Sequence, residues 1–309
     1  MTVTREQVLE ARPRVESRLR RTPVFSSRTL GERVFLKAEL FQATGSFKAR
    51  GALVKIASLG AEERARGVIA ISAGNHAQAV AWAAAAEGID ALVVMWRDAS
   101  EAKVAATRGY GAAVDLEAAG PTEAFERLAE LQAETGRTLV HPFDDPLVQA
   151  GAGTVGLEIV EDVPGLDTIV VPVGGGGLVA GIAAAVSPDV RVVAVEPELS
   201  PALHEGLAAG EPVPVQPRSI ADGLGAPFAG ASAIAACAEH GVESVLVSED
   251  EIAEAMRFLY ARAKLACEPA GAAAVAGLQA GKVRGETICC VVSGGNVAAP
   301  IAAAILAGR

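Results

Sequence analysis

Short runs of β-branched and other apolar residues alternate along the chain with longer Ala-rich segments in which apolar positions recur at helical spacing. The runs predicted as strands span residues 34–38, 68–72, 91–96, 112–116, 168–173, 191–196, 244–248 and 287–293. Helices are predicted over residues 46–58, 75–87, 121–136, 146–161, 177–186, 249–264 and 296–307. An N-terminal helix is expected to be interrupted at Pro13. Strands that alternate with helices form parallel sheets covered by helices, so the pattern predicts an α/β protein.

Composition narrows the class of protein. A chain of 309 residues that is 51% hydrophobic and 21% charged can bury a large core, and its length favours two lobes. The formal net charge of −10 gives no electrostatic reason to bind nucleic acid or an anionic membrane, because both require basic surface. We therefore expect a small-molecule partner, with no nucleic acid and no membrane.

The N-terminal segment and the cysteines suggest where the protein works. The opening MTVTREQVLEARPRVESRL has no apolar core of a signal peptide, and no uninterrupted apolar stretch could span a membrane. The four cysteines do not form a metal-binding spacing, and Cys289 and Cys290 lie in the apolar run TICCVV. We expect a cytoplasmic protein with reduced, buried thiols. The Pro- and Gly-rich segment 211–229 shows neither the helical nor the strand spacing of apolar residues and is expected to be a functional loop.

Lys48 is the first candidate for chemistry. It lies in TGSFKARGA, where a helix is expected to begin with Ser46 as its cap. The positive end of a helix dipole disfavours a cation and lowers the pKa of an amine. A lysine activated in this way forms a Schiff base with a carbonyl cofactor, whereas the ordinary alternative is a solvated lysine on a first turn.

Two further motifs join a strand to the start of a helix. In SAGNHAQAV (72–80), Gly74, Asn75 and His76 offer backbone N–H groups that suit a carboxylate or a phosphate; an ordinary helix cap is the alternative. In VPVGGGGLVAG (171–181), four adjacent glycines let successive N–H groups converge on a phosphate. The same loop, residues 174–180, also matches a dinucleotide-binding pattern, with Glu196 where a ribose-binding acid belongs. VVSGGN (291–296) places Ser293 after the last strand, at the edge where α/β sheets bind ligands.

Taken together, SFKARGA, SAGNHAQ, GGGGL and SGGN resemble, in order and separation, the motifs of fold type II enzymes that use pyridoxal 5′-phosphate (PLP). The chain is most similar to the serine/threonine dehydratases, also called threonine ammonia-lyases, from about Arg21 to Asn296. RRTPV, HPFDDP (141–146), SIADGL (219–224) and CEPAGA (267–272) add to the resemblance.

The resemblance implies an architecture and a set of roles. The fold would be two-lobed and similar to the tryptophan synthase β subunit, with mostly parallel sheets flanked by helices and PLP in the cleft between lobes. Residues 1–45 and 138–309 would form the large PLP-binding domain, and residues 46–137 a small mobile domain. Lys48 would bind the cofactor aldehyde and act as the base at Cα. The implied contacts of the other residues are Gly174, Gly175, Gly176 and Gly177 with the phosphate, Asn75 with the phenolic oxygen, Ser293 with the ring nitrogen, Phe47 and Gly223 with the ring faces, and Ser72, Ala73, Gly74, Asn75 and His76 with the substrate carboxylate.

The expected reaction converts a 3-hydroxy amino acid, L-threonine or L-serine, into an α-keto acid and ammonia. Serine racemase shares these motifs but has a serine where this chain has Ala73, which cannot supply a proton to the opposite face. Dehydratases acting on 3-hydroxyaspartate or 3-phenylserine, an NAD-dependent oxidoreductase and a noncatalytic binding protein are the alternatives.

Two further expectations concern metal and assembly. Related racemases and dehydratases bind a divalent cation through residues that correspond here to Glu196, Ser200 and Ala202, so one carboxylate is absent and no metal is expected. Relatives are commonly dimers or tetramers, which implies a homodimer or homotetramer.

Overall fold

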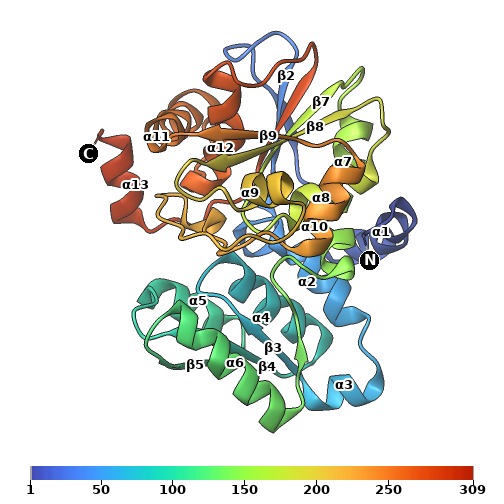
Figure 1. Ribbon diagram of the computed structural model, residues 1–309, viewed down its shortest axis with the longest axis vertical. Helices are drawn as coiled ribbons and strands as arrows, with labels where there is room; N and C mark the ends of the chain where they lie inside the picture. Colours follow the sequence, from blue (N-terminus) through green and yellow to red (C-terminus); the bar gives the residue numbers. More distant parts are fainter. Residues whose placement is uncertain (1, 309) are drawn as a thin grey trace.

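The computed structural model describes residues 2–308 and divides into two lobes, each with its own sheet. The larger sheet has six strands and the smaller has four, and helices cover both (Figure 1). All strand pairs but one are parallel. The prediction of an α/β fold with mostly parallel sheets flanked by helices is therefore confirmed.

The large sheet runs in the order β1-β2-β10-β7-β8-β9. Its strands are β1 (Val24–Ser26), β2 (Val34–Ala38), β7 (Thr168–Pro172), β8 (Arg191–Pro197), β9 (Glu243–Val247) and β10 (Ile288–Val292). Only the edge strand β1 is antiparallel to its neighbour. The last strand in the chain, β10, lies between β2 and β7, so residues from both ends of the chain meet in the middle of this sheet.

The small sheet runs in the order β5-β4-β3-β6. Its strands are β3 (Val68–Ile71), β4 (Ala91–Trp96), β5 (Ala113–Ala118) and β6 (Thr138–Leu139). The two-residue strand β6 pairs with β3 just before the chain returns to the large lobe. Eight of the strands lie where the hydrophobic pattern predicted them, whereas the short strands β1 and β6 carry too few residues to show a period.

Thirteen helices lie in the part of the chain that the structure describes. They are α1 (Arg5–Arg18), α2 (Lys48–Ala57), α3 (Ala61–Arg66), α4 (Asn75–Glu87), α5 (Glu101–Gly109), α6 (Pro121–Thr135), α7 (Pro146–Asp162), α8 (Gly177–Ala185), α9 (Ala202–Ala209), α10 (Ala231–Glu239), α11 (Glu249–Phe258), α12 (Pro269–Gln279) and α13 (Ala299–Leu306). A π-helical turn, Leu259–Ala263, follows α11. None of the helices within residues 2–308 has the length and apolar character needed to cross a membrane.

The cores follow from the alternation of side chains along the strands. Cys289 and Val291 of β10 face a core shared with α1, α7, α8 and α10, and this core continues through α2 and α4 into the small lobe. Cys290 and Val292 face a second core beneath α11, α12 and α13. A third, smaller core lies between the small sheet and α6. All four cysteines are buried and free, which confirms their prediction as core residues.

The predicted interruption at Pro13 is wrong, because α1 continues through it from Arg5 to Arg18. Proline removes only one intrahelical N–H bond and is tolerated where the rest of the helix is anchored. Val8, Ala11 and Val15 anchor α1 by packing into the core, and Thr4 caps it with a reciprocal bond to Gln7.

Helix α7 is the longest helix and is central to the large lobe, since it packs against α1, α2 and α8. Its N-cap is Asp145, whose Oδ1 accepts hydrogen bonds from the backbone N–H groups of Leu147 (2.8 Å) and Val148 (3.2 Å). The other carboxylate oxygen lies 2.7 Å from Nζ of Lys55 on α2.

Replacement of Asp145 by alanine should lower the free energy of unfolding by about 1–2 kcal/mol, because two N–H groups at the start of α7 lose their acceptor. Asp145→Asn should retain most of the stability, since an asparagine oxygen can still cap the helix. Urea unfolding of the cofactor-free protein tests both variants. An equal loss in the two would show that the ion pair with Lys55, and not the cap, is the stabilising contact.

Candidate active site

The predicted site residues gather where parallel strands end and helices begin. Ser72–His76 follow β3, Gly174–Gly177 follow β7, and Ser293 follows β10. Lys48 is the first residue of α2, and Gly223 lies in a short 3₁₀ helix, Asp222–Leu224. Segments from both lobes therefore converge, because the carboxyl ends of parallel strands lie along one edge of each sheet.

Lys48 directs its amine toward the segment that enters the large lobe. Nζ donates a hydrogen bond to the carbonyl oxygen of Pro142 (2.6 Å) and lies 5.3 Å from the centre of the Phe47 ring. Burial lowers the pKa of the Lys48 amine to about 8. The sequence predicted a lowered pKa from the helix dipole, and desolvation is the cause found here. A neutral amine at this position is available as a nucleophile or a base.

Ser46 does not cap α2, and that prediction is wrong. Its backbone is extended and forms a bridge with Gly294, while the N-cap position belongs to Phe47. The Phe47 N–H donates to the carbonyl oxygen of Ser293 (3.1 Å), which joins the start of α2 to the end of β10. The Ser46 hydroxyl is fully buried and has no hydrogen-bond partner among residues 2–308.

The four glycines form a turn whose backbone donors are free. Gly176 has a φ of 90°, a left-handed conformation that favours glycine, and Gly177 begins α8. Among the described residues, no protein acceptor takes a hydrogen bond from the N–H of Gly174, Gly175 or Gly176. The Phe143 ring packs so closely on Gly175 that a Cβ there would overlap it. The turn is thus held rigidly and presents N–H groups at a helix start, the arrangement that binds phosphate.

Asn75 is held by two residues that lie far from it in the chain. Its Nδ2 donates to Oε1 of Glu268 (2.6 Å), and its Oδ1 accepts from Nδ2 of Asn296 (2.7 Å). The Asn296 amide also donates to the carbonyl oxygen of Thr44 (2.7 Å). These contacts fix the orientation of the Asn75 amide and leave one of its N–H groups available to a ligand.

Glu268 is a buried carboxyl group within this cluster. Burial, and then the charge of Asp222, raise the pKa of Glu268 to about 7, against the opposing effects of the Asn75 hydrogen bond and Lys103. The carboxyl group is 3% exposed at the start of α12. The Glu268 side chain is therefore poised to change charge close to neutral pH.

His76 is positioned as a structural group rather than as a base. Its Nε2 lies 2.8 Å from the carbonyl oxygen of Val140, so this nitrogen carries the proton. Burial, together with the charge of Lys48, lowers the pKa of His76 to about 3, and the ring stays neutral. The Ser72 hydroxyl accepts from the N–H of Gly74 (3.1 Å) and shapes the same turn. The backbone N–H groups at the start of α4 are the donors left for an anion.

The remaining predicted residues lie in the same region. A Cβ on Gly223 would lie 2.9 Å from Cβ of Ala270 and 3.9 Å from Nδ2 of Asn75. A residue larger than glycine would therefore have to push the backbone at Gly223 away from Ala270. Ser293 is 4% exposed, and Ala73 packs partly buried against the shared core.

An aromatic group lies beside Lys48 and the glycine turn. The ring of Phe143 makes edge-to-face contacts with His141 and Phe228, at centroid distances of 4.7 Å and 5.7 Å. Phe228 comes from the loop that the sequence marked as functional. These rings provide an apolar wall on the large-lobe side of the site.

Glu196, the residue that a dinucleotide would require, is engaged elsewhere. Its side chain is fully buried, and its two oxygens accept the N–H groups of Leu203 (2.7 Å) and His204 (2.8 Å) at the start of α9. Its carboxylate therefore caps a helix and is not presented to a ribose. Within residues 2–308, no group of three or more acidic, histidine or cysteine side chains is arranged to hold a metal ion.

Sequence reasoning missed two side chains of the site and one backbone group. Glu268, Asn296 and Pro142 lay in stretches noted for their resemblance to a family, CEPAGA, SGGN and HPFDDP, but no role was assigned to these three residues. A glutamate before proline within an otherwise apolar run, as in CEPAGA, was the one available sign of a buried carboxyl group.

Comparisons with known proteins agree with this geometry. A family model for pyridoxal-phosphate dependent enzymes matches residues 15–294. The chain is 43% identical to L-threonine ammonia-lyase of Thermotoga maritima over 304 residues, which cover 96% of this chain and 76% of the relative. It is 42% identical to a catabolic L-threonine dehydratase of Staphylococcus aureus over 302 residues, which cover 93% of this chain and 87% of the relative.

Solved structures of related enzymes have the same fold. Maize serine racemase superposes with a TM-score of 0.92 at 36% identity, covering 97% of this chain and 95% of the racemase. A processed threonine deaminase of Solanum lycopersicum gives a TM-score of 0.91 at 31% identity, and the superposition covers 98% of this chain and 88% of the deaminase.

Replacement of Glu268 by glutamine should change how stability depends on pH. A carboxyl group whose folded pKa is raised from 4.5 to about 7 costs no stability below pH 4.5. The cost grows as the pH rises to 7 and is constant above it. A glutamine side chain at this position keeps an acceptor for Asn75, so E268Q should gain up to about 3 kcal/mol over wild type above pH 7 and nothing at pH 4.

The measurement is the urea unfolding free energy of the cofactor-free protein between pH 4 and pH 8. Glu254→Gln, which alters an exposed carboxylate on α11, serves as the control and should show no such trend. A constant difference between E268Q and wild type across this range would contradict the shifted pKa.

Proposed function

Because the chain belongs to the family of pyridoxal-phosphate-dependent enzymes, and within it to the serine/threonine dehydratases, we propose that it converts L-threonine, and also L-serine, into an α-keto acid and ammonia. The enzyme is a PLP-dependent lyase that releases ammonia. The observation that carries the assignment of roles is the buried Lys48 amine, which bonds to Pro142, next to the Phe143 ring that packs on Gly175.

The residues present fit the cofactor. Gly174–Gly177 would hold the phosphate with N–H groups that no protein acceptor uses, among the described residues. Asn75 would donate its remaining N–H to the phenolic oxygen, and Ser293 would contact the ring nitrogen. Phe47 and Gly223 would flank the ring. The buried, unpartnered hydroxyl of Ser46 supports a polar ligand at the same place.

Each part of the protein then has a task in the reaction. When bound, PLP supplies an electron sink that makes the Cα proton of an amino acid acidic. Lys48, with its pKa near 8, would remove this proton. The N–H groups of the Ser72–His76 turn would hold the substrate carboxylate and so orient Cα toward the amine. His76, which stays neutral, would keep this turn in place through its bond to Val140.

Closure of the small lobe over the large one would exclude water. We take residues 46–137 as the mobile small domain and residues 1–45 with 138–309 as the large one. An ion pair between Lys103 on α5 and Asp222 in the 219–228 loop joins the two lobes beside the site. Asn75 makes a second link to Glu268 and Asn296. These links support a closed state that protects the reacting substrate.

Threonine is the preferred substrate in this proposal because relatives at 42–43% identity carry that name and because Phe143 and Phe228 offer an apolar wall for its methyl group. A keto-acid release assay with threonine, serine, 3-hydroxyaspartate and 3-phenylserine decides the substrate.

We also propose that the protein acts in the cytoplasm, where its four cysteines stay reduced. An exposed Phe25–Phe41 pair beside the edge strand β1 supports a homodimer or homotetramer.

Lys48→Ala should abolish the yellow chromophore that borohydride bleaches and should lower kcat by about 10²–10⁴-fold, because both the covalent anchor and the base are lost. Lys55→Ala, on the same helix but paired with Asp145 near the surface, is the matched control and should retain both. Absorbance spectra and keto-acid formation are the measurements. Unchanged colour and turnover in K48A would refute the role of Lys48.

Ala73→Ser should add racemisation to elimination, because a hydroxyl on the face opposite Lys48 can return a proton to Cα. We expect D-serine to form from L-serine with A73S and not with the wild-type enzyme. Chiral chromatography of the reaction mixture measures it, and Ala73→Gly is the control. Formation of D-serine by the wild-type enzyme would favour serine racemase, which the similarity to the maize enzyme keeps as the second candidate.

A further inference from the structure

Helix α7 touches two other helices at the level of their backbones. A Cβ on Gly151 would lie 2.5 Å from the carbonyl oxygen of Arg50 and 2.8 Å from Cα of Gly51, both on α2. On the other side of α7, a Cβ on Gly153 would lie 2.5 Å from the carbonyl oxygen of Gly181 on α8. Neither crossing can accommodate a larger residue without separating the helices. The three helices therefore form one rigid stack in the order α2, α7, α8.

The outer helices of this stack carry the two ends of the proposed cofactor site. Helix α2 begins at Lys48, and α8 begins at Gly177, the last glycine of the turn. A cofactor that is bonded to an amine at one end and held by its phosphate at the other requires a fixed distance between the two. Helix α7 lies between α2 and α8, so its thickness at the glycine crossings determines this distance.

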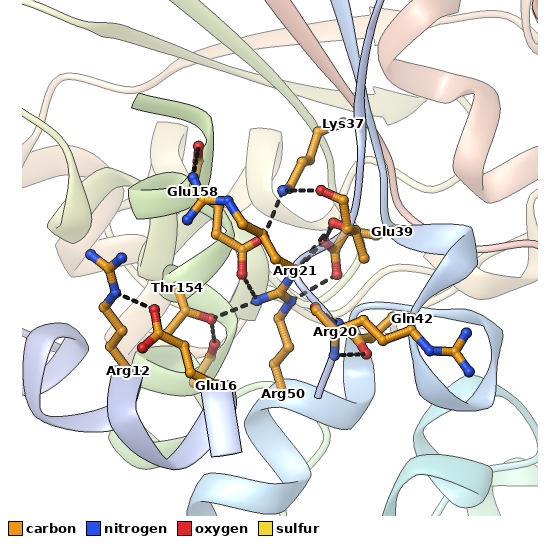
Figure 2. A network of polar contacts seen from close by, with 12 residues as sticks. Arg12, Glu16, Arg20, Arg21, Lys37, Glu39, Gln42, Arg50, Thr154 and Glu158 are labelled. Atoms are coloured by element: carbon orange, nitrogen blue, oxygen red, sulfur yellow. Dashed lines mark hydrogen bonds and ion pairs between the residues drawn. The ribbon is translucent and has the colours of Figure 1, made fainter. Parts of the chain in front are cut away.

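Arg50 locks α2 onto the stack. It lies two residues after Lys48, which places it on the opposite face of α2. Its Nη1 donates to Oε1 of Glu158 on α7 (2.7 Å), and its Nε donates to Oε2 of Glu39 (2.9 Å), just beyond β2. Figure 2 shows the guanidinium between these two carboxylates. Arg50 thus ties the helix that carries Lys48 both to α7 and to the large sheet.

The surroundings of Arg50 leave it little freedom to move. Lys37 donates to Glu158 (2.6 Å) and to the carbonyl oxygen of Thr22 (2.8 Å), so two cations face two anions in a neutral cluster. Arg50, Lys37 and Glu39 are fully buried. Nη1 of Arg50 also donates to the Thr154 hydroxyl (3.1 Å). A neutral, fully hydrogen-bonded cluster in the interior favours a single geometry, since any displacement leaves a buried charge unpaired.

We propose that α7 is the spacer that sets the distance between the Lys48 amine and the Gly174–Gly177 turn, and that Arg50 is the positioning residue that holds α2 on this spacer. This inference rests on the proposed function, because it assigns the two anchors of PLP to Lys48 and to the glycine turn. It assigns a task to Gly151, Gly153 and Arg50, none of which touches the cofactor in the proposal.

The test uses two ligands that differ only in whether they can bond to lysine. PLP has an aldehyde, whereas pyridoxine 5′-phosphate has the same ring and phosphate with an alcohol in its place. Gly151→Ala should move α2 away from α7 and weaken PLP binding by about 10-fold or more, while pyridoxine phosphate binding changes by less than about 2-fold. Equilibrium binding to the cofactor-free protein is followed by absorbance and by tryptophan fluorescence.

Gly156→Ala is the matched control, because it makes the same change on the same helix. A Cβ there would meet Cβ of Ala185 at 3.3 Å, a contact that a shift of a few tenths of an ångström relieves. G156A should bind both ligands as the wild type does. K48A serves as the reference in which the preference for PLP over pyridoxine phosphate is lost entirely.

Arg50→Lys tests the contacts of Arg50 with Glu39 and Glu158 without changing the charge at this position. A lysine ammonium cannot bond to both carboxylates with the planar geometry of a guanidinium, so α2 should lose its fixed position. We expect kcat to fall by about 10–100-fold with KM changed by less than about 3-fold, together with the same selective loss of PLP binding. Met256→Ala, in the second core, is the control for lost stability and should keep the ratio of the two affinities.

The outcomes separate the inference from the proposed function. Wild-type affinity ratios in both G151A and R50K, or an equal loss of both ligands, would overturn the spacer and leave the proposed function standing. An unchanged chromophore in K48A would instead refute the proposed function. A selective loss of PLP in G151A and R50K, with G156A and M256A unaffected, would establish the spacer.

Discussion

The proposed function requires that the Lys48 amine be removed from water and still remain reactive, and its surroundings meet both conditions. Burial lowers the pKa of the amine to about 8, and its hydrogen bond to Pro142 adds no opposing charge. A paired carboxylate would have kept the amine charged and unreactive. The amine lies at the start of α2, which packs on the large lobe through α7 and on the small lobe through α4. The reactive group therefore stands where the two lobes meet, on a helix that belongs to the core of both.

Two kinds of buried titratable group lie in and behind the site, and their environments differ in one respect. Lys48, His76 and Glu268 lack an oppositely charged partner in contact, and burial shifts each pKa toward the neutral form. Arg50, by contrast, contacts Glu39 and Glu158 and keeps its charge, with its pKa raised. Lys48 and Glu268 thus have pKa values close to neutral pH, whereas the permanent charges of Arg50 and its two carboxylate partners lie behind the site. In the proposed function, the cofactor phosphate and the substrate carboxylate would be held by N–H donors.

Most of the fold could be predicted because eight strands have β-branched runs long enough to show their character, and the glycine turn and Lys48 stand in motifs between a strand and a helix. The failures have physical reasons. Helices α10 and α12, which were not among the predicted helices, consist almost entirely of small and apolar residues and have no marked start or stop signal apart from a proline in α12. The continuation of α1 through Pro13 and the bridge of Ser46 to Gly294 depend on tertiary packing. Glu196 could be read as a cofactor ligand or as a structural acid, and only the position of α9 decided between them. Glu268 comes from a segment far from Asn75 in the chain, so their contact could not be foreseen.

The comparison with solved structures shows that the fold alone does not determine the reaction, because a serine racemase and a threonine deaminase both superpose closely on this chain. The fold of maize serine racemase is nearly superposable on this one, with a TM-score of 0.92. A second proton donor opposite the lysine would allow a proton to return to Cα from the other face, and in the proposed arrangement Ala73 offers only a methyl group there. With no donor on that face, a substrate that has lost its Cα proton can proceed only by recapture from Lys48 or by loss of its hydroxyl group. If Ala73 has the place proposed for it, elimination is the forward path, and the missing hydroxyl favours the dehydratase on a fold common to both reactions.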